Sequence, residues 1–530
     1  MNTKRRLFTC LVTLGLLSAV KPVLAATENG TNDAQLQKVL TQTAALEHQM
    51  KMLKAEIREL KSEQKSLKTT QVNEVQTENA LVKSSHQHVW GYAPSSGPVR
   101  AYPTTEKTGE TSDMYFVHNL GSPIVISSYL GEHTAFDASD LIINYSSYNE
   151  SLNLLRLKQK VYRRLNCDTD SQTLPFIMLS GKIEGIADYQ KPSNDVSNSS
   201  VNLEDAELDF APVINDWASG FVGLQYLFVT EPSVSPRVVN TSRVHINKAF
   251  VTFGNLERFP LYLTMGQNNV PFGQYSSPMI TSPLTDSIFK TRAQEVLLGY
   301  ANQDPRGFYG SVFAFNGDTH TNRNNSINNV GANLGYVIKN DNWNAELGAG
   351  YISNIADSFG MQLTGAPNGA FGGFSTSPAI SGITSEKIQH QVGGADVHAT
   401  FGTGPFSLIA EYIQATQAFT PMDMTFNGRG AEPKALDVEG NYSFHIMDKP
   451  TALSIGYGKS WEALALNVPE SRYIAALTTS LYKDTIEELE FRHDIAYGSG
   501  VSASGFMVPT PAVLKGFSSN TVTAQIGIYF

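Results

Sequence analysis

The residues in this chain best suited to chemistry are acids that recur at every second position of alternating segments. In 177–189, Lys182, Glu184 and Asp188 alternate with apolar residues such as Ile183. Successive side chains of a strand point to opposite faces, so the polar residues share one face. The acids predicted on this face are Glu184, Asp188, Asp205, Glu207, Asp209, Glu346, Asp396, Glu411, Asp437, Glu439, Glu488, Glu490 and Asp494, and the bases are Lys182, Lys248 and Arg492. Carboxylates that line a pore attract cations, so this pattern predicts ion selection.

A second charged group lies in the long connection 269–293, which contains Asp286, Lys290 and Arg292. Charges at a narrow point of a pore control what passes, whereas charges on a surface loop are screened by salt. We therefore predict that this connection folds into the lumen, where these three residues form a constriction and a substrate site. The alternative is a surface loop that only covers the mouth.

The sequence singles out no catalytic constellation. No Ser-His-Asp arrangement or acidic pair stands out, so we expect no enzyme activity and no cofactor. His86 and His88 lie in a polar stretch without further ligands, so we expect no metal site there. Cys10 lies within a predicted signal peptide, which leaves Cys167 as an inert thiol with no intrachain disulfide.

Alternating segments that could position the acids fill the chain from residue 173 onward. We predict an all-β transmembrane barrel of sixteen antiparallel strands because every second connection is short, as in outer-membrane barrels. No later stretch is apolar enough for a membrane helix. The predicted strands are 177–189, 201–212, 217–229, 244–254, 260–268, 294–301, 307–316, 329–338, 343–353, 388–401, 406–417, 433–444, 451–460, 471–482, 486–497 and 521–530.

Both ends of the chain favour export to the outer membrane. Residues 1–25 have a basic start, an apolar run and a small-residue cleavage site, which predicts a signal peptide. Phe530 ends the last alternating segment, and we interpret it as the signal that the barrel assembly machinery reads. Cleavage removes four basic residues and makes the formal charge of −10 more negative, which argues against a nucleic-acid partner.

The segment before the barrel has three predicted parts. Residues 26–70 form a periplasmic coiled coil, with a heptad pattern over 36–67 that suits a parallel homo-oligomer, and we favour a trimer by analogy with porins. Residues 71–112 read as a linker. Residues 113–172, with a helix over 150–165, form a small mixed segment packed on or in the barrel. The coiled-coil core includes Leu46, Met50, Leu53, Ile57 and Leu60.

Several motifs resemble known porin families. Residues 266–273, Gly-Gln-Asn-Asn-Val-Pro-Phe-Gly, resemble an element of phosphate-selective-type porins, and 180–189 resemble their first strand. Residues 137–144 and 149–155, together with the order of coil and barrel, resemble more closely the LbtU-type siderophore porins of Legionella and relatives. This resemblance implies a sixteen-stranded outer-membrane barrel that takes up ferric siderophores without a large plug domain. It supplies no ligand residues.

Together, these features predict a channel in the outer membrane with a periplasmic N-terminal region and a ferric siderophore as cargo. An acidic lumen repels an anionic ferric complex, so two alternatives stay open. One is a general or cation-preferring diffusion porin, and the other is a structural tether between outer membrane and cell wall. Outer-membrane lipid and the assembly machinery are the remaining expected partners.

Overall fold

The computed structural model describes residues 114–119, 122–127, 149–168, 174–228 and 242–529, with gaps at 194, 303, 305, 322–326, 341–342, 363, 365–370, 372, 375–385, 448, 483–484 and 506–515. Of two compact units, Met1–Gln87 and His88–Phe530, the described residues belong to the second. The predicted signal peptide, coiled coil, linker and terminal Phe530 lie outside the described residues.

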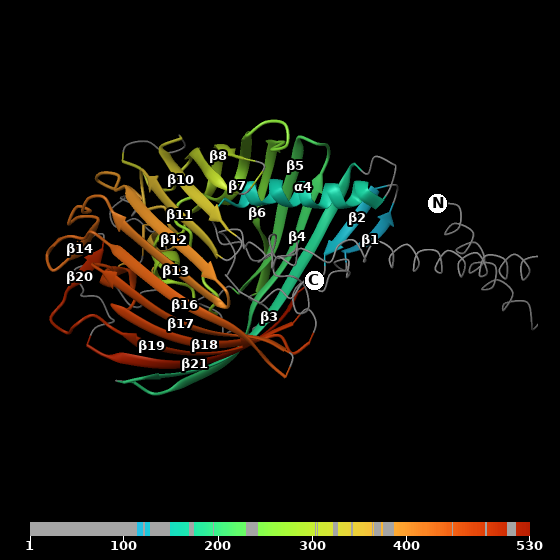
Figure 1. The fold of residues 1–530 in the computed structure, drawn as a ribbon. Coiled ribbons are helices and arrows are strands. Elements are labelled where there is room, and N and C mark those ends of the chain that lie inside the picture. The colour runs from blue at the N-terminus through green and yellow to red at the C-terminus, as the bar shows by residue number, and fades with distance from the viewer. Residues whose placement is uncertain are drawn as a thin grey trace, which may run out of the picture. The chain divides into compact units, whose positions relative to one another are not determined.

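Sixteen strands form a closed antiparallel barrel (Figure 1). Each strand pairs with the next along the chain, and the last pairs with the first, so the predicted barrel is confirmed. The barrel strands are β3 (Phe176–Pro192), β4 (Asn198–Val213), β5 (Ala218–Phe228), β6 (Ser242–Gly254), β7 (Leu261–Asn269), β8 (Arg292–Ala301), β9 (Gly307–Phe315), β10 (Asn329–Lys339), β11 (Trp343–Ile352), β12 (Gly394–Thr403), β13 (Phe406–Ala415), β16 (Lys434–Ile446), β17 (Lys449–Trp461), β18 (Ser471–Thr479), β19 (Thr485–Ile495) and β21 (Ser518–Tyr529).

The alternation of side chains explains why these segments form a barrel wall. On β21, Val522, Ile526 and Ile528 are exposed on the outside, while Thr521 and Thr523 between them are buried. A membrane barrel needs this pattern because its outer face meets lipid and its inner face meets polar groups. The outer rows of the other strands are likewise apolar and exposed.

Two predicted strands run too far at one end. The pattern 388–401 predicted a strand from Ile388, but β12 begins at Gly394, and Ile388 and Val392 lie in the buried cluster of the long connections. The alternating pattern 486–497 placed Tyr497 in the outward row, but β19 ends at Ile495. Tyr497 is only 4% exposed, and its hydroxyl lies 2.7 Å from Ser460 Oγ and accepts a bond from Ala463 N. The ring turns into the packing of the long connections because a buried tyrosine there gains both apolar contact and two polar partners.

A short hairpin covers the free edge of β3. Strands β1 (Met114–Asn119) and β2 (Ser122–Ser127) pair with each other, and β2 runs parallel to β3 over 177–179. The pairing of β21 with β3 reaches only from Ser519 to Tyr529, which lies opposite Lys182. The hairpin therefore supplies hydrogen-bond partners where the closing strand ends.

Helix α4 (Glu150–Asp168) packs against the inner face of the wall. Leu154, Leu157 and Val161 form one cluster with Phe176 and Phe221 of β3 and β5. Lys158 Nζ donates to the carbonyl oxygens of Asp216 and Gly254 at 3.0 Å each, next to two short connections. Burial lowers the pKa of Lys158 to about 8. The helix therefore occupies the lumen near the end that carries the short connections.

Among the described residues, no helix combines the length and apolar character required to cross a bilayer.

The long connections share one hydrophobic core at the opposite end. They carry the small strands β14 (Met424–Phe426), β15 (Arg429–Gly430) and β20 (Ala503–Gly505), and the short helices α5 (Leu284–Phe289), α6 (Phe359–Gln362) and η2 (Leu464–Leu466). The ring centroids of Phe371 and Phe374 lie 4.9 Å apart, and those of Phe374 and Phe419 lie 5.3 Å apart. These rings belong to the same buried cluster as Ile288 of α5.

Candidate functional site: the inward loop and its carboxylate anchors

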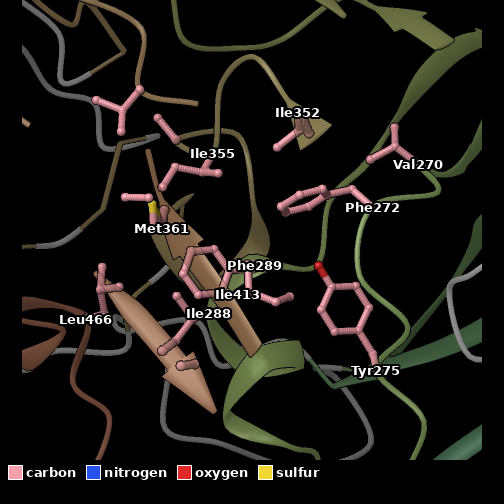
Figure 2. Close-up of a cluster of buried hydrophobic side chains, with 14 of the residues drawn as sticks. Val270, Phe272, Tyr275, Ile288, Phe289, Ile352, Ile355, Met361, Ile413 and Leu466 are labelled. Carbon is pink, nitrogen blue, oxygen red and sulfur yellow. The ribbon is translucent and has the colours of Figure 1, made fainter. Parts of the chain in front are cut away.

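The connection 270–291, here called the inward loop, folds against the inner wall of the barrel. Its apolar side of Phe272, Ile288 and Phe289 belongs to one buried cluster with Ile352 and Ile413 (Figure 2). Burial of these apolar side chains holds the loop against the wall. The short helix and extended stretches of the loop still leave backbone N–H groups without partners in the loop itself. The wall must supply those partners.

Glu411 of β13 supplies the largest share. Its carboxylate accepts hydrogen bonds from Gln274 N, from Tyr275 N at 3.2 Å and from Thr285 Oγ1 at 2.5 Å. Asp437 of β16 accepts from Thr285 N at 2.9 Å and so serves as a cap for α5. Residues 274, 275 and 285 of the loop are thus bound to the neighbouring strands β13 and β16.

Three more acids hold the remainder of the loop. Glu439 accepts from Ser277 Oγ at 2.9 Å, and Glu488 accepts from Ile280 N at 3.1 Å. Glu490 accepts from Thr281 twice, at 2.9 Å from N and 2.5 Å from Oγ1. All five acids are at least nine-tenths buried. A buried donor left without a partner costs roughly 1–3 kcal/mol, so these contacts fix the loop position.

This arrangement changes the meaning of the acidic pattern. The alternating pattern predicted that Asp437, Glu439, Glu488 and Glu490 are charges that face an open lumen. In the structure they accept hydrogen bonds from the inward loop, which covers them. Because the loop covers these four acids and donates to them, their effect on a passing ion is smaller than a bare acidic ring implies.

Other inward charges pair with each other. Lys182 lies 2.8 Å from Asp205 and 3.3 Å from Glu184, while Asp188 accepts from Ser200 Oγ at 2.5 Å. On β18 and β19, Asp494 pairs with two arginines: its carboxylate lies 2.8 Å from Arg472 Nε and 3.1 Å from Arg492 Nε. Sequence reasoning missed Arg472, although its place two residues before the inward Ile474 could have shown it. The two arginines also reach the inward loop at Ser282 O and Thr281 Oγ1, 3.2 and 3.0 Å away.

The predicted group of Asp286, Lys290 and Arg292 does not form one cluster. Lys290 Nζ lies 3.1 Å from Asp286 one helical turn earlier. Arg292 points elsewhere: its guanidinium lies 4.7 Å from the Phe359 ring centroid and donates to Asn247 O at 3.1 Å. Lys290 lies near the end of the inward loop, and Arg292 is the first residue of β8. Their role in selection stays a prediction.

A polar network ties two of the long connections together at the same end. Asp357 accepts from Thr319 N at 2.8 Å, from Thr319 Oγ1 at 2.9 Å and from Asn354 Nδ2 at 3.1 Å. A fourth bond comes from Asn329 Nδ2 at 2.5 Å. Burial outweighs these donors and raises the pKa of Asp357 to about 6.

This network should loosen as the pH rises above 6. A carboxyl whose folded-state pKa lies above its ordinary value stabilises the fold fully below that ordinary value, and the contribution is lost as the pH rises through 6. The side chain keeps some solvent contact, so the expected effect is of order 1 kcal/mol. Hydrogen exchange at 316–321, corrected for the intrinsic rate, should show stronger protection at pH 5 than at pH 7.5. The Asp357→Asn variant should lose this difference, and equal protection of the wild type at both values would contradict the prediction.

The fold and the inner wall define a porin-like β-barrel, and comparisons identify its family. No family model matches the chain. A UPF0422 protein of Legionella pneumophila (strain Lens) is 38% identical over 452 residues, which cover 83% of this chain and 82% of the relative. A UPF0422 protein of Coxiella burnetii (strain RSA 493 / Nine Mile phase I) is 36% identical over 415 residues, or 77% of this chain and 84% of the relative. The chain belongs to the UPF0422 family.

Solved structures of porins are also similar to this chain. The outer membrane channel DcaP of Acinetobacter baumannii is 14% identical, with a TM-score of 0.42 over 68% of this chain and 99% of that one. An anion-selective porin from Comamonas acidovorans is 13% identical, with a TM-score of 0.41 over 67% and 99%.

Proposed function

We propose that this protein is an outer-membrane channel whose passage is narrowed by the inward loop and by α4, with a ferric siderophore as its cargo. The observation that carries the channel is the closed barrel with apolar rows outside and charged groups inside. The cargo is supported by the resemblance to LbtU-type siderophore porins. The predicted signal peptide supports export to the outer membrane.

The wall around the inward loop fits a selective passage better than a wide pore. A barrel of sixteen strands is too wide for its own side chains to fill. Here α4 and the inward loop take up part of that width. Lys290 lies near the end of the loop, and Arg292 begins β8 directly after it. In this proposal the two cations draw the anionic ferric complex towards the narrow point, against Asp286.

A cation-preferring diffusion porin is the second candidate. It is favoured by the excess of acids over bases on the described inner wall, where only some acids hold the loop. Asp205 and Asp494 pair with bases, whereas Glu207 and Asp209 are further buried acidic groups on the described inner wall.

A separate proposal concerns assembly: we propose that residues 36–67 assemble the chain as a trimer on the periplasmic side.

A deletion strain provides the test of the cargo. Under iron limitation, loss of the gene should abolish growth that depends on the added ferric siderophore, and wild-type protein should restore it. The double variant Lys290→Glu with Arg292→Glu should restore it poorly while conducting small cations as well as or better than wild type. Arg306→Glu, at an exposed short connection, should restore growth fully and serves as the matched control.

Unchanged siderophore-dependent growth in the deletion strain would remove the cargo. The diffusion porin would then lead if unrelated small solutes enter the deletion strain more slowly and the purified channel prefers cations.

A further inference from the structure

Two buried carboxyl groups and one buried imidazole lie close together on the wall beneath the inward loop. Asp396 and His398 share the inward face of β12, and His398 lies directly opposite Glu411 of β13. One ligand atom from each of the three lies within 4.8 Å of the others. Their exposed fractions are 2%, 1% and 4%. Sequence reasoning placed the two acids on the inner wall but missed the histidine between them, although the Asp-x-His spacing put both on one face.

The neighbouring strand leaves room for this cluster. Gly348 and Gly350 of β11 lie opposite His398 and Asp396. A Cβ added at Gly348 would lie 2.1 Å from His398 Nε2, and one added at Gly350 would lie 2.1 Å from Asp396 Oδ1. The His398 ring and the Asp396 carboxylate therefore occupy space that a side chain at position 348 or 350 would fill.

Hydrogen bonds within the described residues do not satisfy every polar atom here. Asp396 Oδ2 lies 2.7 Å from His398 Nδ1, but Asp396 Oδ1 is buried without a hydrogen-bond partner among the described residues. The Tyr275 hydroxyl is also buried without a hydrogen-bond partner among the described residues. It points from the loop towards Phe272 and Ile413 (Figure 2). Buried polar atoms without partners call for another group.

We propose that Asp396, His398 and Glu411 bind a divalent first-row transition-metal ion, with the Tyr275 hydroxyl facing the same site. One imidazole and two carboxylates are a donor set that Zn²⁺, Mn²⁺ and Fe²⁺ accept. Two carboxylates buried this close together repel each other, and a divalent cation removes that cost. The proposal concerns a fixed ion in the wall and does not depend on what the channel carries.

The ion would act on the passage through Glu411. The same carboxylate accepts hydrogen bonds from Gln274 N, Tyr275 N and Thr285 Oγ1 of the inward loop. A metal ligand held in this way has fewer orientations open to it, and its partners are fixed in turn. Metal binding should therefore stiffen the attachment of the inward loop to β12 and β13.

The test uses the full-length mature protein folded in detergent, stripped with a chelator and then exposed to Zn²⁺ or Co²⁺. After removal of free ion, wild type should retain about one equivalent per chain by elemental analysis. Co²⁺ should give visible absorption of a site with nitrogen and oxygen ligands. Zn²⁺ should raise the thermal unfolding midpoint of the stripped protein, because an ion that binds only the folded state stabilises it.

Matched variants separate this site from other histidines. His398→Ala and the near-isosteric Asp396→Asn should each lose at least about tenfold in affinity. His390→Ala, in a long connection, and the pair His86→Ala with His88→Ala should bind like wild type. If the His398 and Asp396 variants do not give heat-modifiable barrel, the midpoint shift of stripped wild type decides alone. Less than stoichiometric retention by folded wild type, no midpoint shift, or full binding by a folded His398→Ala variant would overturn the proposal.

Discussion

The double variant Glu411→Ala with Glu490→Ala should release the inward loop and raise single-channel conductance at least about twofold, because in the proposed channel this loop narrows the passage. Glu411 and Glu490 receive five hydrogen bonds from the loop. Losing these acceptors also leaves buried backbone donors without partners, which adds to the cost of the docked position. The loop should then spend part of its time away from the wall, visible as current noise. Planar bilayer recordings with a chelator present measure the effect apart from any bound ion.

Two further variants make this prediction specific. Glu411→Gln with Glu490→Gln keeps neutral acceptors and should give an intermediate conductance. Asp304→Ala removes an acid at an exposed short connection and should leave the conductance unchanged. If the double alanine variant folds into a heat-modifiable barrel and conducts like wild type, the acids do not hold the loop in the way described here.

The second large effect is expected at the buried ion pair that seats α4. Lys248 Nζ lies 3.2 Å from Glu150 Oε1, and their side chains are 7% and 0% exposed. Asn269 Nδ2 donates to the same oxygen at 2.9 Å. Lys248→Met leaves Glu150 buried with its cation removed, which typically costs about 3–5 kcal/mol. The helix should detach, with faster proteolysis of 149–168, a lower thermal midpoint and a larger conductance.

A double-mutant cycle provides the control. Lys248→Met combined with Glu150→Met replaces the pair by apolar side chains and should recover much of the lost stability. Arg258→Ala breaks a mostly exposed pair with Asp216 and should change the free energy of unfolding by less than about 1 kcal/mol. A Lys248→Met protein as stable as wild type would show that the pair does not seat α4.

The sequence alone predicted the barrel well because its signal is local. Lipid outside and polar groups inside force a period of two on every strand, so Ile183 and Glu184 could be assigned to opposite faces without knowing their neighbours. Most limits of the strands held within a few residues, but the predicted strand 388–401 begins only at Gly394. The error at Tyr497 arose where a strand passed into packed connections and the alternating environment ended.

The candidate site could be predicted only in part. Alternation placed Glu411, Asp437 and Glu490 on the inner face, but it could not show that loop donors at Gln274, Thr281 and Thr285 meet them. Those contacts join residues more than 100 positions apart, and they depend on how far each strand is shifted against the next. For the same reason Lys290 and Arg292, close in sequence, have different partners.

What the sequence by itself determined is therefore the wall: the number of strands, their order and the face that each side chain takes. Only the tertiary structure decided what fills the wall. The seating of α4, the carboxylate anchors of the inward loop and the meeting of Asp396, His398 and Glu411 all result from register and closure. A period of two specifies direction for each residue, whereas distance across a closed barrel is fixed by the pairing of all sixteen strands at once.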